Sequence, residues 1–466
     1  MSNNLIALAD FGSTFTKLSL VDVNSGRLIG NGQRPTCIDT DVIDGYRKTL
    51  EDVCSTVGIN PEGIKGLAAS SAGGGLSVAA IGLVEDYTAS AARQAALNAG
   101  ARVQKIWSGR LNAACSTALN SLAPDVMLFS GGTDGGHTQQ VLENAATLAG
   151  SSYKCPVIIA CNSAAAEVAA EIFAAKGFEV VVTANVLPEI DNMNIEPARE
   201  AINRLFVEQV ILGKGLSNTS EFSDKVIMPT PEAVLIATDL FSKGTESSAG
   251  VGDIMTIDIG GATTDIHSAK RETALGRGLS MHGPSYPTLM RSVQGDLGMR
   301  WNADNVLKED TVWLEEMFRE RDLDPKIMRD TCYKRISDPH FLATTNSLDG
   351  ILDQLLATSC AALSIQRHCG SSRAVYVPNQ GLDIIQEGTD FRDVPLLVGT
   401  GGVLIHMENG IDALEAALSR QGTTTLAPKS PRFVLDTQYI LATAGLLSTV
   451  SPQAAFNLMK TELMPD

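Results

Sequence analysis

The pattern of apolar and polar positions at the start of the chain predicts three short strands, a helix and a fourth strand. The apolar runs within residues 5–37 are joined by tight turns, of which Asn24-Ser25-Gly26 is a clear hairpin signal. From Asp41 to about Val57 apolar residues recur at helical spacing, and Gly58 is a typical helix stop. Residues 64–69 return to an apolar run of strand length. The predicted order is three antiparallel strands, a helix and a strand.

A different pattern of apolar and polar residues follows between residues 126 and 187. Short apolar runs at 126–129, 157–160 and 180–183 alternate with helical patterns at 139–148 and 163–175. Alternating strands and helices at this spacing predict a parallel, doubly wound sheet. We therefore expect an inserted α/β subdomain over residues 126–217.

The second half of the chain repeats one feature of the first. A helix is predicted from Pro231 to Phe241, and a strand–turn–strand hairpin begins at Ile254. The charged stretch from Lys308 to Arg329 is typical of a helix with a solvated face. Two apolar helices, at 437–447 and 452–459, close the chain.

These patterns predict an α/β protein with two related halves. The order at the N-terminus resembles the start of a ribonuclease-H-like unit. We expect one ribonuclease-H-like lobe from 1–125 with 218–253, the inserted subdomain at 126–217, and a second lobe from 254–466 that includes the C-terminal helices.

Composition and charge narrow the possible functions. A length of 466 residues is enough for about three domains. The net charge of −17 argues against a nucleic-acid-binding surface. No charge-free apolar run approaches about 20 residues, so no membrane-spanning helix is expected, and the N-terminus lacks the basic region of a signal peptide. The eight cysteines form no C-x-x-C pair, which favours reduced, buried thiols in a cytoplasmic protein over a metal site.

Two glycine-rich hairpins carry the candidate chemistry, because in each an apolar strand ends in Asp and a Gly turn with hydroxyl residues follows. Their candidate residues are Asp10, Gly12, Ser13, Thr14, Thr16 and Lys17 in the first, and Asp258, Gly260, Gly261, Thr263 and Thr264 in the second. Glycine lets backbone N–H groups approach phosphate oxygens, and the hydroxyls can add hydrogen bonds. The carboxylates of Asp10 and Asp258 can hold a hydrated Mg²⁺, and Lys17 can reach the β- and γ-phosphates. One hairpin alone is weak evidence, but the pair predicts an ATP or ADP site gripped from both sides.

Two weaker signals accompany the hairpins. The turn Gly399-Thr400-Gly401-Gly402 follows an apolar strand and precedes a helix, so its backbone can pack against a purine and ribose. Such turns also occur without a ligand. Glu232 opens the helix ahead of the second hairpin and can hold Mg²⁺-bound water or orient the attacking water. It is equally typical of an acid favoured by the helix dipole.

Other features suggest no catalytic role. The glycine-rich turns at 70–75 and 130–137 can bind an anion at a helix N-terminus, but close packing in a doubly wound sheet is favoured. His137, His368 and His406 have no partner at metal-ligand spacing, which is typical of ordinary packed or surface histidines.

Taken in order, the motifs resemble those of the actin/Hsp70/sugar-kinase superfamily. Asp10-Phe11-Gly12-Ser13-Thr14 with Lys17 corresponds to the phosphate-1 motif, Pro231-Glu232-Ala233 to connect-1, Asp258 to Asp265 to phosphate-2, and Gly399 to Gly402 to the adenosine motif. The stretch from Pro231 into the second hairpin is especially similar to Hsp70. The resemblance implies an actin-like fold around a nucleotide cleft.

A narrower resemblance covers essentially the full length. Residues 69–76, 130–136 and 426–430 look like the glutamate mutase (methylaspartate mutase) accessory protein family, called MutL in the mutase operon and distinct from the mismatch-repair protein. This resemblance implies an ATPase that acts as a reactivating chaperone for an adenosylcobalamin-dependent mutase and drives the exchange of damaged cobalamin. The implied partners are the mutase subunits, and a homodimer is also compatible. Residues 126–217, absent from the minimal fold, are then a candidate mutase-binding part.

Three rival functions remain at the level of sequence. A small-molecule kinase of the same superfamily would need a carboxylate base, for which Asp134 or Asp239 are candidates. An actin-like assembly module would need self-association surfaces, which a single sequence does not reveal. An activator of the acyl-CoA reductase type would need cysteines placed to share a cluster, which the scattered cysteines disfavour.

Overall fold

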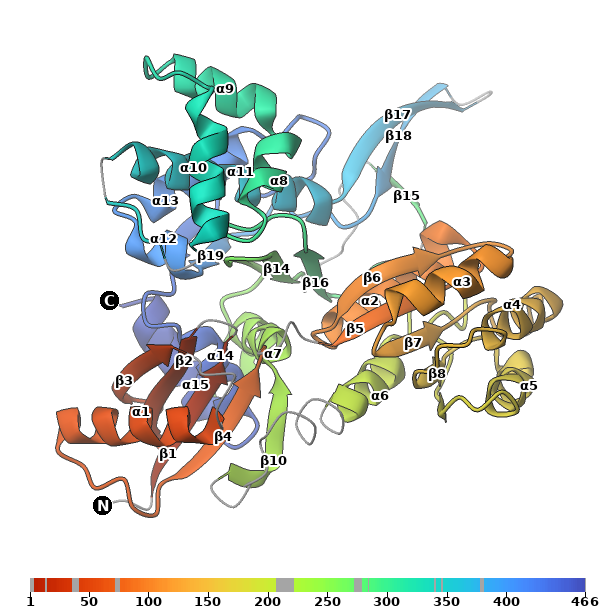
Figure 1. Ribbon diagram of the computed structural model, residues 1–466, viewed down its shortest axis with the longest axis horizontal. Coiled ribbons are helices and arrows are strands. Elements are labelled where there is room, and N and C mark those ends of the chain that lie inside the picture. The colour runs from red at the N-terminus through yellow and green to blue at the C-terminus, as the bar shows by residue number, and fades with distance from the viewer. Residues whose placement is uncertain are drawn as a thin grey trace. The chain divides into compact units, whose positions relative to one another are not determined.

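The computed structural model describes residues 4–12, 15–35, 42–71, 76–206, 222–271, 279–283, 285–338, 341–344, 347–377 and 381–465. The chain divides into two compact units, and Figure 1 labels their helices and strands. Unit 1 takes Met1–Ala237, Gly283–Pro287 and Ala442–Leu458, and unit 2 takes Thr238–His282, Thr288–Leu441 and Met459–Asp466. Each unit contains one mixed five-stranded sheet, and unit 1 also contains a parallel one.

The mixed sheet of unit 1 begins with the first glycine-rich hairpin. Its strand order is β10-β4-β1-β2-β3, with β1–β2 and β2–β3 antiparallel and β1–β4 and β4–β10 parallel. The strands are β1 (Leu5–Phe11), β2 (Phe15–Asp22), β3 (Leu28–Pro35), β4 (Lys65–Ser70) and β10 (Phe222–Pro229). Helix α1 (Val42–Val57) buries Tyr46, Val53 and Cys54 in one core with β1 and β2. The predicted order of three strands, helix and strand is confirmed.

The hairpin between β2 and β3 shows why the sequence turns there. The Asp22 carboxylate accepts hydrogen bonds from the backbone N–H groups of Asn24 (3.0 Å) and Ser25 (2.8 Å). Gly26 adopts a φ of 75°, a conformation that costs glycine little.

The second sheet of unit 1 is entirely parallel, in the order β6-β5-β7-β8-β9. Its strands are β5 (Ser77–Ile81), β6 (Arg102–Trp107), β7 (Val126–Phe129), β8 (Val157–Ile159) and β9 (Val180–Val182). The connecting helices are η2 (Glu85–Ala89), α2 (Ser90–Asn98), α3 (Ala113–Leu122), α4 (Gln139–Ala149), α5 (Ser163–Ala174) and α6 (Glu196–Phe206). Val78 and Ala80 pack with α2 and α6, whereas Ala79 and Ile81 pack with α3, α4 and α5. Successive side chains of a strand point to opposite faces of the sheet, so the sheet has a hydrophobic core on each face.

The predicted boundary of this module at residue 126 needs correction. Strand β5 is the partner of both β6 and β7, so the sheet begins at Ser77 and not at Val126. The complete module has five strands and runs from β5 to α6, residues 77–206. Its order places β5, the first strand, inside the sheet, which is the doubly wound arrangement.

The mixed sheet of unit 2 repeats the arrangement of the first. Its order is β16-β14-β13-β19-β20, which corresponds to β3-β2-β1-β4-β10 of unit 1. In both sheets the first two of these pairings are antiparallel and the last two are parallel. The strands are β13 (Ile254–Ile259), β14 (Thr264–Ala269), β16 (Leu289–Gln294), β19 (Leu396–Thr400) and β20 (Arg432–Leu435). Two ribonuclease-H-like sheets with one strand order confirm the predicted α/β, actin-like fold class.

The other elements of unit 2 are small hairpins and helices. They are β11 (Gly244–Thr245), β12 (Ser248–Ala249), β15 (Ser280–His282), β17 (Ser371–Val377), β18 (Gly381–Glu387), α8 (Ala303–Glu309), α9 (Thr311–Arg319), α10 (Ile327–Ser337), α11 (Leu348–His368), α12 (Gly402–His406) and α13 (Gly410–Ser419). The charged stretch after Lys308 is thus divided between three helices. Helix α11 is long and apolar enough to cross a membrane, but 67% of its apolar window is buried within the protein.

The described cysteines are free thiols, and all of them except Cys115 are buried. Burial raises the pKa of the Cys155 and Cys161 thiols to about 12. These thiols therefore stay protonated and unreactive at neutral pH.

The sequence suggested that the C-terminal helices belong wholly to the second half. In the structure, part of them groups with unit 1. Residues 442–458, from α14 (Ile440–Ser448) and α15 (Pro452–Leu463), group with unit 1. The Thr443 hydroxyl donates to Ser19 of β2 at 3.2 Å, and the Asn457 amide donates to the Ser25 carbonyl at 3.2 Å. Conversely, residues 238–253, including the end of α7 (Thr230–Lys243), group with unit 2. The division therefore falls inside two helices, α7 and α14.

Helices α7 and α14 meet within unit 1 at a glycine. A Cβ on Gly445 would lie 1.9 Å from the carbonyl oxygen of Ala233, a distance that two such atoms cannot adopt. We expect Gly445→Ala to lower the free energy of unfolding by about 1–3 kcal/mol, because the helices must separate. The measurement is urea unfolding followed by circular dichroism.

Gly45 in α1 provides the matched control, because a Cβ there would have no atom within 4 Å. Gly45→Ala should stabilise the protein by about 0.5–1 kcal/mol, as expected for an open helical position. Equal effects of the two substitutions would contradict the close crossing.

Candidate functional site

Asp10 lies at the end of β1, where the first glycine turn begins. It is paired across the sheet with Lys17, and the hydroxyl of Thr230 donates to its Oδ1 at 2.5 Å. Burial raises the pKa of the Asp10 carboxyl, while the Lys17 charge and the Thr230 hydrogen bond act to lower it. Lys17 therefore stands beside Asp10, and its contact with the β- and γ-phosphates stays a prediction. Ser13 and Thr14 lie outside the described residues.

The turns of the two hairpins have the same backbone contact. The N–H of Gly12 donates to the Phe15 carbonyl at 3.0 Å, and the N–H of Gly260 donates to the Thr263 carbonyl at 2.9 Å. A Cβ on Gly12 would lie 2.7 Å from the Phe15 carbonyl oxygen, and one on Gly260 would lie 3.1 Å from that of Thr263. The tightness of the turn therefore excludes a side chain at position 12 unless the backbone shifts, and it makes a side chain at position 260 a close contact.

Asp258 occupies in β13 the place that Asp10 occupies in β1. It is paired with Asp265 on one side and with Thr400 of β19 on the other. Gly401 follows with a φ of 99°, and a Cβ there would lie 2.3 Å from the Ile259 carbonyl oxygen and 2.9 Å from Asp258 Oδ1. The structure therefore brings the Gly399–Gly402 turn directly against the second hairpin, within unit 2.

A further polar group stands beside Asp258. Buried Asp436 follows β20 and accepts hydrogen bonds from the Thr400 hydroxyl (3.4 Å) and from the backbone N–H groups of Ile440 (2.8 Å) and Leu441 (3.2 Å) in α14. The Tyr439 hydroxyl lies 3.2 Å from His406 Nε2. Burial, with the nearby charges of Asp258 and Asp436, raises the pKa of Tyr439 to about 12.

Several candidate residues face the interior and need correction. Thr264 is completely buried, and its hydroxyl donates to the Leu297 carbonyl at 3.0 Å. Thr16, at the equivalent place in β2, is only 1% exposed. A Cβ on Gly399 would touch leucine side chains, among them Leu414 at 2.7 Å, so this glycine serves core packing. Thr16 and Thr264 do not present their hydroxyls at the surface, because alternate side chains of a strand point inward, and Gly399 of β19 faces the core.

The remaining residues of the second turn are better placed. Gly260, Gly261 and Thr263 are not buried, and the carbonyls of Gly260 and Gly261 are held by the backbone N–H groups of residues 299–301. The Thr263 hydroxyl donates to Asp265 at 3.1 Å. Gly402, at the start of α12, is exposed. This part of the predicted set therefore lies at the surface of unit 2 near Asp258.

Glu232 has contacts that the sequence did not reveal. Its carboxylate pairs with Arg199 and accepts a hydrogen bond from the Asn203 amide at 2.5 Å, both from α6. The side chain is 5% exposed, and burial raises the pKa of Glu232 to about 7 despite the Arg199 charge. Thr230, and not Glu232, is the α7 residue that contacts Asp10. Glu232 thus joins α7 to the parallel module.

Asp134 and Asp239, the candidates for a kinase base, both have hydrogen-bond or ion-pair partners in the structure. Asp134 accepts hydrogen bonds from the Ser163 N–H (2.8 Å) and the Asn185 amide (3.0 Å). Burial acts to raise the pKa of Asp134, but these hydrogen bonds hold it below its usual value. Asp239 pairs with Lys243 at 2.9 Å and with Arg271. Neither arrangement favours a proton acceptor.

The turn at 130–137 supports the packing interpretation. The Asn185 amide donates to the Gly132 carbonyl at 3.0 Å, and the Asn162 amide donates to the Gly136 carbonyl at 3.1 Å. Residues 72–75 of the other glycine-rich turn lie outside the described residues.

Two site residues escaped the sequence analysis although they carry a signal. Thr230 stands immediately before Pro231, and Asp436 stands between an apolar strand and a helix. Both are positions where a hydroxyl or carboxylate typically caps a helix. Tyr439 has no such signal. Its backbone φ of 54° is uncommon for a tyrosine, and local sequence does not predict it.

The raised pKa of Glu232 predicts a pH dependence of stability. Below its ordinary value of 4.5 the group is protonated in both the folded and the unfolded protein. As the pH rises from there to about 7, only the unfolded chain loses the proton, so stability falls, by at most about 1.4 kcal/mol per pH unit. Glu232→Gln should remove this slope in urea unfolding measured over that range. Glu196→Gln, which alters an exposed partner of the same arginine, should retain the slope. Identical slopes in all three proteins would contradict the assignment.

Comparison with known proteins identifies the family of the chain. The family model described as MutL protein matches residues 6–463. Protein MutL of Clostridium tetanomorphum is 35% identical over 460 residues, which is 98% of each chain.

Solved structures are similar only at a distance. The ethanolamine utilization protein EutJ from Carboxydothermus hydrogenoformans has 10% identity and a TM-score of 0.32, covering 98% of this chain and 90% of its own. The activator of 2-hydroxyisocaproyl-CoA dehydratase from Clostridium difficile has 8% identity and a TM-score of 0.33, covering 97% and 95%. At these scores the fold assignment rests on the strand order of the two mixed sheets. The sequence matches over nearly the whole length show that the chain belongs to the MutL protein family.

Proposed function

We propose that this chain is an ATP-hydrolysing accessory protein that reactivates an adenosylcobalamin-dependent mutase in the cytoplasm. The observation that carries the nucleotide part is the equivalence of Asp10 and Asp258. Each ends the first strand of its sheet, precedes a glycine turn with the same backbone contact, and is neighboured by the parallel fourth strand. The mutase part rests on the family resemblance of the sequence.

The residue types of the two hairpins are those that a nucleotide with Mg²⁺ would need. Asp10 and Asp258 are half-buried carboxylates, the ligand type that a hard cation prefers, and Lys17 supplies a positive charge beside Asp10. When bound, Mg²⁺ would neutralise charge on the phosphates. Gly12 and Gly260 would let backbone approach the phosphates, and Gly401 and Gly402 would let it approach the adenosine.

The Thr230 hydroxyl has a positioning role in this proposal. By donating to Asp10 Oδ1 it fixes the orientation of this carboxylate, which would then be held ready to accept from a metal-bound water. Asp436 acts similarly in unit 2, because it holds Thr400 next to Gly401.

Removing either carboxylate should abolish most hydrolysis. We expect Asp10→Ala and Asp258→Ala each to reduce Mg²⁺-dependent ATP turnover on the order of 100-fold while the fold survives, as for the loss of one electrostatic group. Asp52→Ala, in an exposed pair with Arg34, is the control and should leave turnover unchanged. Steady-state phosphate release measures the effect. Wild-type turnover in both variants would rule out the paired-hairpin site.

The mutase should bind the parallel module at residues 77–206. This module lies outside the mixed sheets, and such additions to a scaffold commonly carry specific function. We expect the affinity for the mutase to differ between the ADP and ATP states, and by linkage the mutase must change nucleotide affinity by the same factor. Isothermal titration of the full chain with mutase, in each nucleotide, measures both sides of the cycle. Equal affinities would leave ATP unable to drive cofactor exchange and would favour the kinase function.

A further inference from the structure

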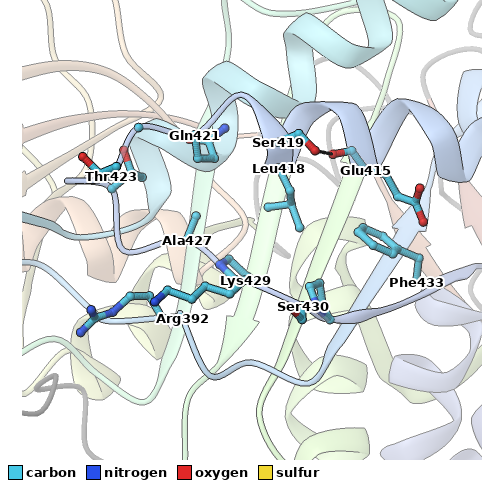
Figure 2. Close-up of a pocket in the computed structure, with 14 residues that line it drawn as sticks. Arg392, Glu415, Leu418, Ser419, Gln421, Thr423, Ala427, Lys429, Ser430 and Phe433 are labelled. Carbon is cyan, nitrogen blue, oxygen red and sulfur yellow. Dashed lines mark hydrogen bonds between the residues drawn. The ribbon is translucent and has the colours of Figure 1, made fainter.

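Unit 2 contains a pocket of about 490 Å³ that the proposed nucleotide site does not use (Figure 2). Its walls come from the C-terminal half of α13, the loop at 421–425, the segment 427–431 and the start of β20, with Arg392 from the loop before β19. This volume lies within the range of small-molecule sites. The pocket also includes most of the segment 426–430, one of the stretches that carry the family resemblance.

The pocket lies at the opposite end of the sheet from Asp258. Arg392 precedes β19 and Lys429 precedes β20, whereas Thr400 and Asp436 follow these strands. Because both strands run in one direction, the pocket is at their amino ends. From Pro431 to Asp436 the separation is roughly 16 Å at the usual rise per strand residue. A ligand here would occupy a site distinct from that of the nucleotide.

Two cations stand together at one side of the pocket, as Figure 2 shows. Arg392 is oriented by Asp390, which accepts from its Nε (3.0 Å) and its Nη2 (2.7 Å). The N–H of Lys429 donates to the Arg392 carbonyl at 3.2 Å, so the two residues share one braced backbone. Within the described part of the chain, neither Arg392 Nη1 nor the Lys429 ammonium has a hydrogen-bond or ion-pair partner. Arg392 Nη1 and the Lys429 ammonium are therefore donors available to an oxyanion, while Asp390 and the nearby charge of Asp393 offset part of the positive charge of Arg392.

The other side of the pocket has a different character. Leu418 and half-buried Phe433 provide apolar surface, and Glu415 stands next to them. The Ser419 hydroxyl donates to the Glu415 carbonyl at 2.9 Å, so this hydroxyl already has an acceptor within α13. The acidic group on this side disfavours a second anionic end. A ligand that matches both sides has one anionic end and an apolar body.

We propose that this pocket binds a small organic anion, with its carboxylate or phosphate group held by Arg392 and Lys429 and its apolar part against Leu418 and Phe433. The recognition resembles that of other small-ligand sites, in which a few placed polar groups orient an otherwise apolar contact. The site does not depend on the nucleotide function, so the two can fail separately.

The experiment uses the full chain and two probes, inorganic phosphate and butyrate, in isothermal titration. Lys429→Ala should weaken the binding of the preferred probe about tenfold, as for the loss of one charged hydrogen-bond donor, and Lys429→Glu should abolish it. Lys460→Ala, another exposed lysine of unit 2, is the matched control and should leave binding unchanged. A second readout is acetylation of lysines followed by mass spectrometry, in which the probe should protect Lys429 and leave Lys460 reactive.

The outcomes separate the possibilities. Tighter binding of butyrate identifies a carboxylate ligand, and tighter binding of phosphate identifies a phosphate ligand. Both support the pocket if Lys429 is protected. Equal binding by wild type and Lys429→Glu, or no protection of Lys429 by either probe, would overturn the proposal. Phosphate binding that survives Lys429→Glu but is lost in Lys17→Ala would place the ion at the first hairpin and would equally overturn it.

Discussion

Parallel pairing of the first and fourth strands in each mixed sheet is the constraint on which the candidate site depends. It fixes where the strand ends meet, so Asp10 lies beside Ala69 and Asp258 beside Thr400. In unit 2 the pairing also brings Gly401 within reach of the Asp258 carboxylate, and only a residue without a side chain fits there. The glycines of the motif are thus a consequence of strand geometry as much as of any ligand.

The sequence was informative where local pattern and tertiary structure agree. Strand–turn–strand hairpins and the alternating elements after Val126 were predictable, because periodicity and turn residues decide them locally. The start of the parallel module was not, because β5 is a short apolar run that becomes recognisable only through its pairing with β6 and β7. The placement of α14 in unit 1 depends on contacts with residues more than 400 positions away, such as Ser19.

Within the candidate site the sequence predicted residue types better than side-chain directions. Thr264 and Gly399 belong to the right motifs, but one is buried and the other packs against leucines. For Glu232 the sequence left open a role with Mg²⁺-bound or attacking water and a role as an acid favoured by the helix dipole, and it did not reveal the contacts with Arg199 and Asn203. A motif fixes where the backbone goes, while the neighbours brought in by the fold decide which groups remain available. The equivalent positions Lys17 and Asp265 show the same limit, since one hairpin kept a cation where the other has a carboxylate paired with Arg291.

The hydrogen bonds of Asp436 hold the start of α14 next to the end of β20. Its first turn is fastened to the end of β19 through Thr400, next to the glycines proposed to meet the adenosine. Its later residues, from Ala442 onward, are part of unit 1. One helix therefore contributes residues to both units, and the side chain of Asp436 provides hydrogen bonds to its first two residues. Loss of that carboxylate would leave the backbone N–H groups of Ile440 and Leu441 without these acceptors, next to the strand that carries Thr400.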